Sequence, residues 1–151
     1  MDAVSGKYLR LLRRRALSAL RWARRAFEEG DYDTAVREAE YAAQLYIKSL
    51  LYRVMGEEVR GHDLRELLGV LISALIEGDL EDEAKTLVDY VRRRRRELAW
   101  LSEAHTRAVY GPTECGRREA ELLLRIAEDV VETLRRLEAR IFGEEPSLEQ
   151  S

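Results

Sequence analysis

The residues best suited to chemistry in this chain are two histidines and one cysteine. His62 and His105 are the only histidines among the 151 residues, and Cys115 is the only cysteine. Histidine changes charge near neutral pH, so it is the usual general acid or base. The histidines are not spaced as helical zinc ligands and the cysteine has no partner, so the sequence predicts neither a metal site nor a cofactor.

A run of consecutive arginines, Arg92 to Arg96, suits contacts to phosphate. Successive helical residues point around more than a full turn, so the plainer interpretation is a solvated face paired with acidic side chains. If the helix is continuous, one arc of about 100 degrees opposite its apolar stripe combines cations with aromatic rings. These candidates for nucleotide or RNA binding are Arg93, Arg96, Trp100, Arg107 and Tyr110.

Each of these residues also has a structural interpretation. Trp100 on a polar face indicates a subunit interface, a nucleotide or RNA contact, or packing within the chain. His105 lies on the apolar stripe and His62 precedes a helix start, so hydrogen bonding within the fold competes with a catalytic role for both. Cys115 has no histidine near it in sequence, which favours no nucleophilic role.

The elements that must position these residues are helices. Apolar residues recur every three or four positions in five segments, over about 7–29, 31–54, 63–77, 81–110 and 117–141. Asp31 or Asp33 is expected to cap the second segment, and Asp63 the third. Ala-rich faces predict close packing of the first two helices. The fourth segment is long enough to contain a break.

Length and composition place these helices in one domain. The 151 residues are 46% hydrophobic and 36% charged, with nine Gly and two Pro, which favours long helices around one core. We expect a single domain over residues 1–142 and an acidic flexible tail over 143–151. Early arginines interrupt any signal peptide and no apolar run reaches about 20 residues, so a cytoplasmic protein without a membrane segment is expected.

The second helix and its preceding turn resemble the signature of the HEPN family. The stretch from Glu28 to Leu51 reads EEGDYDTAVREAEYAAQLYIKSLL. Its residues in the family's order are Asp31, Tyr32, Asp33, Ala35, Ala42, Gln44, Lys48 and Leu51. Two shorter stretches, His62-Asp63-Leu64 and Arg107-Ala108-Val109-Tyr110-Gly111-Pro112, are similar to further family elements, and the likeness spans about residues 20–137.

This resemblance implies an all-α, up-and-down bundle of four principal helices plus a shorter additional helix, and a homodimer. It also implies a module that binds a nucleotide or RNA and acts with a separately encoded minimal nucleotidyltransferase. Catalytic HEPN ribonucleases resemble one another in an arginine followed after four to six residues by a histidine. No arginine of this chain stands at that spacing from His62 or His105.

The missing spacing favours a non-catalytic binding module. The first alternative is a metal-independent endoribonuclease toxin of a toxin-antitoxin pair, in which Arg107 holds phosphate and His62 or His105 is the acid or base. The second is a structural protein that dimerises through the Trp100 face.

Overall fold

The computed structural model describes residues 3–143, with side chains described from residue 6 onward. This part of the chain is all-α, as predicted, and no strand occurs in it. Its helices are α1 (Ala3–Glu28), α2 (Tyr32–Met55), α3 (Leu64–Glu77), α4 (Glu81–Arg93), α5 (Arg95–Tyr110) and α6 (Arg117–Phe142). The predicted tail lies outside the described residues apart from Gly143, which ends α6. Within 3–143, no helix is both long and apolar enough to cross a bilayer.

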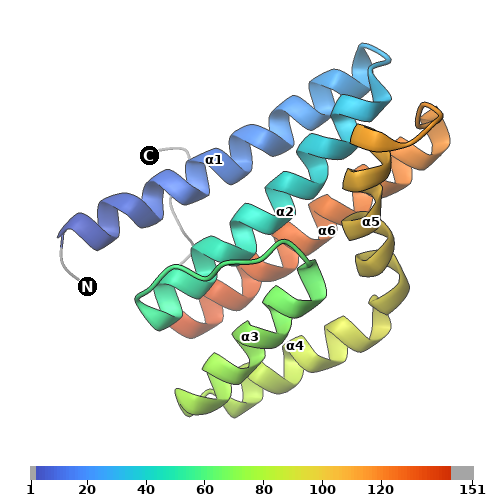
Figure 1. Ribbon diagram of the computed structural model, residues 1–151. Coiled ribbons are helices and arrows are strands. Elements are labelled where there is room, and N and C mark those ends of the chain that lie inside the picture. The colour runs from blue at the N-terminus through green and yellow to red at the C-terminus, as the bar shows by residue number, and fades with distance from the viewer. Residues whose placement is uncertain (1–2, 144–151) are drawn as a thin grey trace.

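Helix α2 lies at the centre of the molecule and contacts α1, α3, α5 and α6. Figure 1 shows α1, α2 and α6 running side by side, with the α3–α4 hairpin below them and α5 closing one end. Both α1 and α2 carry buried alanines, and small side chains let packed helix axes approach closely. These alanines are Ala16, Ala19, Ala23, Ala35, Ala39, Ala42 and Ala43.

A buried carboxylate ties the three long helices together. Glu138 of α6 is fully buried and pairs with Arg13 of α1 and with Arg53 of α2, the latter at 2.8 Å. The hydroxyl of Tyr46 donates a hydrogen bond to the same carboxylate at 2.9 Å. Burial raises the pKa of Tyr46 to about 12, so the phenol remains a donor. A buried charge is tolerated only when it is paired in this way.

The fourth predicted segment is two helices rather than one. Helix α4 ends at Arg93 and α5 begins at Arg95, with Arg94 between them at φ −106° and ψ 17°. The guanidinium group of Arg94 lies 3.2 Å from Glu97 and 3.6 Å from Asp129. The break turns α5 back onto α2, where Leu98 is fully buried. The arc of binding residues predicted for one continuous helix therefore does not describe this segment.

Candidate functional site

The loop between α2 and α3 holds His62 in a fixed position. Asp63 caps α3 by accepting backbone hydrogen bonds from Arg65 at 2.9 Å and from Glu66 at 3.1 Å. The backbone N–H of Leu64 donates to Ser102 Oγ of α5 at 3.1 Å. These bonds fix the loop at both α3 and α5.

Gln44 of α2 determines which nitrogen of His62 carries the proton. Its amide nitrogen donates to the carbonyl oxygen of Gly61 at 3.1 Å and approaches Nδ1 of His62 at 2.9 Å. An amide nitrogen only donates, so Nδ1 accepts and the neutral ring carries its proton on Nε2. The Nε2–H side is left to face solvent or a ligand.

The second histidine meets a buried carboxylate. Nδ1 of His105 on α5 lies 3.3 Å from Oε1 of Glu40 on α2, whose side chain is only 5% exposed. Burial raises the pKa of Glu40 to about 7, opposed by the charge of Lys48. Burial, followed by the charges of Arg37 and His62, lowers the pKa of His105. The contact does not have hydrogen-bond geometry, so it places a carboxyl group and an imidazole with opposed pKa shifts side by side without a bond between them.

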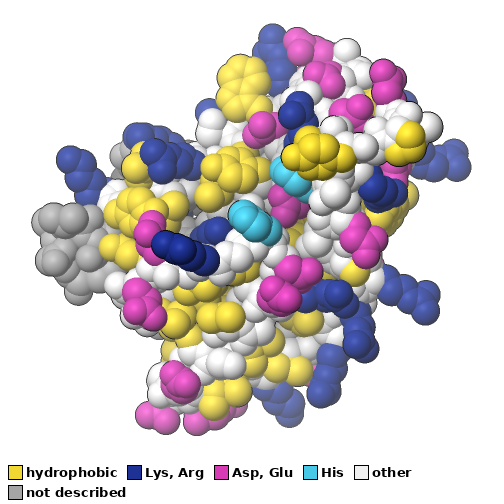
Figure 2. Space-filling model, in the orientation of Figure 1, with side chains coloured by type: hydrophobic (Ala, Val, Ile, Leu, Met, Phe, Trp, Pro, Cys, Tyr) yellow, Lys and Arg dark blue, Asp and Glu magenta, His cyan; other side chains and the backbone are white. Residues whose placement is uncertain are grey.

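Both histidines line one cavity of about 440 Å³, which we call the histidine pocket. Its lining includes Glu40, Gln44, His62, Ser102 and His105, contributed by α2, the α2–α3 loop and α5. Figure 2 shows both histidines on the same face, with hydrophobic, basic and acidic side chains gathered around them. Titratable groups with opposed pKa shifts in one cavity are typical of a functional site.

His62 also borders a second cavity, of about 410 Å³, which we call the tyrosine groove. Its aromatic lining comes from Tyr8 of α1 and from Tyr41 and Tyr52 of α2. The basic side chains in the same lining are Arg15, Lys48 and Arg60. The rings of Tyr8 and Tyr52 meet edge to face, with centroids 5.1 Å apart, and the hydroxyl of Tyr8 donates to Glu58.

Some lining residues of the tyrosine groove lie seven residues apart on each helix, and Trp22 continues this spacing beyond the lining. Tyr8, Arg15 and Trp22 recur in this way along α1, as do Tyr41 and Lys48 along α2. Residues seven apart share a helix face, so Trp22 lies on the face of α1 that lines the groove. Trp22 is 59% exposed and Tyr41 is 44% exposed. The groove thus offers accessible rings beside cations.

The structure brings two of the five predicted binding residues together. The indole N–H of Trp100 and a guanidinium N–H of Arg107 donate to the same oxygen of Glu119 on α6, at 3.3 and 3.0 Å. Burial opposes ionisation of Glu119, but hydrogen bonds from Cys115 and Trp100 and the charge of Arg107 give a net lowering of its pKa. Burial and the bond to Glu119 raise the pKa of Cys115 to about 12, so its thiol stays protonated.

The other three predicted residues lie apart from that pair. Arg93 belongs to α4 and lines a cleft against α6. Arg96 is exposed on the first turn of α5, and Tyr110 at its end is 82% exposed. Arg107 lines a small cavity of about 90 Å³ whose lining contains neither His62 nor His105. The arc from Arg93 to Tyr110 is therefore not one surface.

Glu40 and Tyr41 were not among the residues predicted from the sequence, and Lys48 was named only as part of the family signature. The signal for Glu40 was present, because it stands four residues after buried Val36 and within the buried face of α2. A carboxylate on a buried stripe is a candidate for a perturbed pKa. No cluster of three or more side chains suited to a metal ion occurs within the described residues.

Comparison with protein-family models matches residues 9–137 to the HEPN domain. Comparisons with curated proteins and with solved structures give no significant match.

Proposed function

We propose that the chain, which belongs to the HEPN family, binds a nucleotide or a short single-stranded RNA in the tyrosine groove. The observation that carries this proposal is the combination of Tyr8, Tyr41 and Tyr52 with basic side chains around one cavity of about 410 Å³. Bases stack on aromatic side chains without needing a particular sequence, and cations beside them hold the phosphates. We assign base contact to Tyr41, the most exposed ring of the groove after Trp22 of the adjoining face.

The charges of the groove support this assignment. Arg15, Lys48 and Arg60 line it, whereas Glu58 is its acidic lining residue and accepts the hydroxyl of Tyr8. That hydrogen bond is the first cause that raises the pKa of Tyr8, so its ring stays neutral. The cations are therefore available to phosphate, although the formal net charge of the whole chain is −3.

The proposal is tested by fluorescence anisotropy with a labelled eight-nucleotide RNA in low salt. Replacing Tyr41 by Ala removes one stacking surface, worth about 1–3 kcal/mol, so the affinity should fall about tenfold. Lys48→Gln should weaken binding and reduce its dependence on salt concentration.

The matched controls are Tyr110→Ala and Arg107→Ala, on the face that the sequence singled out. We expect both to bind RNA as the parent chain does. If they lose affinity while Tyr41→Ala keeps it, the α5 face is the binding site and the groove is not.

A second candidate function is metal-independent RNA cleavage in the histidine pocket. The observation that favours it is the meeting of His62, His105 and Glu40 at one cavity. Neutral His105 would take the proton of a 2′-hydroxyl as that oxygen attacks the phosphorus, because Nδ1 of His62 is occupied by Gln44 and its Nε2 carries a proton. His62, in its protonated form, would give a proton from Nε2 to the departing 5′-oxygen, leaving a 2′,3′-cyclic phosphate. Arg65 lines this pocket and Arg107 does not, so Arg65 would contact the phosphate.

This candidate is tested with labelled RNA and an excess of protein in the presence of a chelator. Cleavage that disappears in His105→Ala and His62→Ala, but persists in Tyr110→Ala, supports it. RNA that stays intact removes it and leaves the binding proposal untouched. We also propose a homodimer and a minimal nucleotidyltransferase partner, and both rest on family membership alone.

A further inference from the structure

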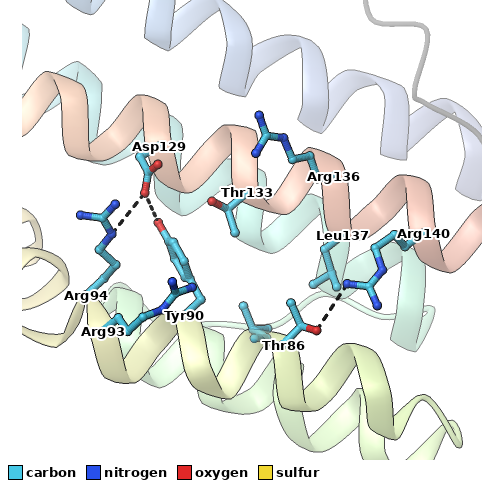
Figure 3. Close-up of a pocket in the computed structure, with 10 residues that line it drawn as sticks. Thr86, Tyr90, Arg93, Arg94, Asp129, Thr133, Arg136, Leu137 and Arg140 are labelled. Atoms are coloured by element: carbon cyan, nitrogen blue, oxygen red, sulfur yellow. Dashed lines mark hydrogen bonds and ion pairs between the residues drawn. The ribbon is translucent and has the colours of Figure 1, made fainter.

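We propose that the cleft between α4 and α6 binds a linear oligophosphate, a diphosphate or triphosphate that is either free or the tail of a nucleotide. The cleft has a volume of about 360 Å³ and lies apart from the tyrosine groove, with no lining residue in common. Four arginines surround it. They are Arg93 and Arg94 at the end of α4, and Arg136 and Arg140 of α6. Figure 3 shows Arg140 reaching across to Thr86 of α4, whereas the guanidinium of Arg136 is directed away from α4.

The single acidic residue lining the cleft is already engaged. Asp129 accepts a hydrogen bond from the hydroxyl of Tyr90 at 2.8 Å and lies 3.6 Å from Nε of Arg94. Burial, followed by the bond to Asp129, raises the pKa of Tyr90, which keeps the phenol protonated. The lining itself therefore carries four guanidinium groups and one carboxylate.

Three further carboxylates lie near the arginines without lining the cleft, and the first is Glu97, 3.2 Å from Arg94. Glu132 is 3.2 Å from Arg136 and Glu83 is 3.7 Å from Arg140. The three paired arginines are each 46% exposed or more, so these pairs are weak and a tighter anion can displace them.

The shape and chemistry of the lining select the class of anion. Guanidinium groups bind phosphate oxygens through paired hydrogen bonds, and here they lie on two helices across an opening. An anion held from both sides must present oxygens along its length, as linked phosphates do and a single carboxylate does not. The hydroxyl of Thr86 already donates to the carbonyl oxygen of Asp82, so the arginines are the donors that the cleft offers. The volume falls in the range of small-molecule sites.

The test is calorimetric titration of the full chain with sodium triphosphate, without divalent cations and in low salt. We expect saturable binding with a 1:1 ratio. Arg136→Gln and Arg93→Gln should each weaken it at least tenfold, with unchanged thermal unfolding confirming that the variants fold. The matched control is Arg125→Gln, because Arg125 pairs with Glu121 four residues earlier on α6, as Arg136 pairs with Glu132, but does not line the cleft.

The outcomes separate this site from the groove. Tyr41→Ala should bind triphosphate normally, whatever it does to RNA binding. Equal affinity for triphosphate and adenosine triphosphate would identify a free oligophosphate as sufficient, and tighter binding of the nucleotide would identify its tail as the ligand. Absence of saturable binding at millimolar triphosphate, or an equal loss in Arg125→Gln or Tyr41→Ala, would overturn the proposal.

Discussion

At the scale of single residues, the histidine pocket is characterised by which ring nitrogens and carboxyl groups carry protons. Gln44 places the proton of neutral His62 on Nε2, and Glu40 lies 3.3 Å from Nδ1 of His105. Held in this way, neutral His62 can only donate at Nε2, so the proton acceptor of the pocket is the imidazole of His105. The same contacts also stabilise the junction of α2 with α5, so they serve the fold whether or not a reaction takes place.

The raised pKa of Glu40 makes stability depend on pH. The folded-state pKa of about 7 exceeds the ordinary value of 4.5, so the folded chain holds this proton more tightly than the unfolded chain. The stabilisation is complete below pH 4.5 and is lost as the pH rises through 7. Glu40→Gln carries no such charge, so its free energy of unfolding should not show this loss. Relative to the parent chain, it should increase on the order of 3 kcal/mol as the pH rises from 5 to 8.

Urea unfolding of both proteins at the two pH values measures this difference. His105→Gln is the companion variant, because the lowered pKa of His105 works in the opposite direction and costs stability as the pH falls. Parallel pH dependence in Glu40→Gln and the parent chain would contradict the assignment of a buried, proton-holding carboxyl group.

At the scale of elements, the ends of α5 decide which side chains can meet. The break at Arg94 separates Arg93 from the rest of the predicted arc and places it in the cleft with α6. At the other end, the N–H of Gly111 donates to the carbonyl oxygen of Arg107 at 2.8 Å. This bond closes the helix directly beside the contact of Arg107 with Glu119.

Gly111 is therefore expected to tolerate no side chain. A Cβ atom at this position would clash with the carbonyl oxygen of Arg107, a backbone atom that cannot move without opening the last turn. Gly111→Ala should lower the free energy of unfolding by about 1–3 kcal/mol, the usual cost of a strained backbone site. Differential scanning calorimetry measures the loss.

Gly116 provides the control within the same loop region. Nothing lies within 4 Å of a Cβ atom built there, so Gly116→Ala should cost clearly less than Gly111→Ala. Equal costs would show that the end of α5 adjusts freely and that the position of Arg107 is not fixed by this turn.

At the scale of the whole molecule, the two tryptophans have different surroundings. Trp100 packs against the core and its indole N–H reaches Glu119, whereas Trp22 is 59% exposed. Packing and a hydrogen bond within the chain thus occupy part of the Trp100 side chain. An exposed ring of the size of Trp22 marks a surface that meets a ligand or another chain.

We therefore expect Trp100→Ala to act on stability and Trp22→Ala on assembly or binding. Loss of a half-buried indole should lower the free energy of unfolding by about 2 kcal/mol without changing the molar mass measured by light scattering. Trp22→Ala should leave unfolding nearly unchanged and should lower either the molar mass or the affinity for RNA. A fall in molar mass with Trp100→Ala alone would instead place a dimer interface on the α5 face.

The sequence by itself determined the family, the helical class, most helix ends and the buried stripes, because these depend on local periodicity and on capping groups such as Asp31 and Asp63. Tertiary structure alone decided that Glu40 meets His105, that Glu138 joins three helices and that Arg93 faces α6. These contacts join residues distant in sequence, and they depend on where α4 breaks and how α5 crosses α2. The periodicity of apolar residues within one helix carries no information about how helices cross. The predicted arc of binding residues is therefore split between two helices, whereas the buried positions remain as expected.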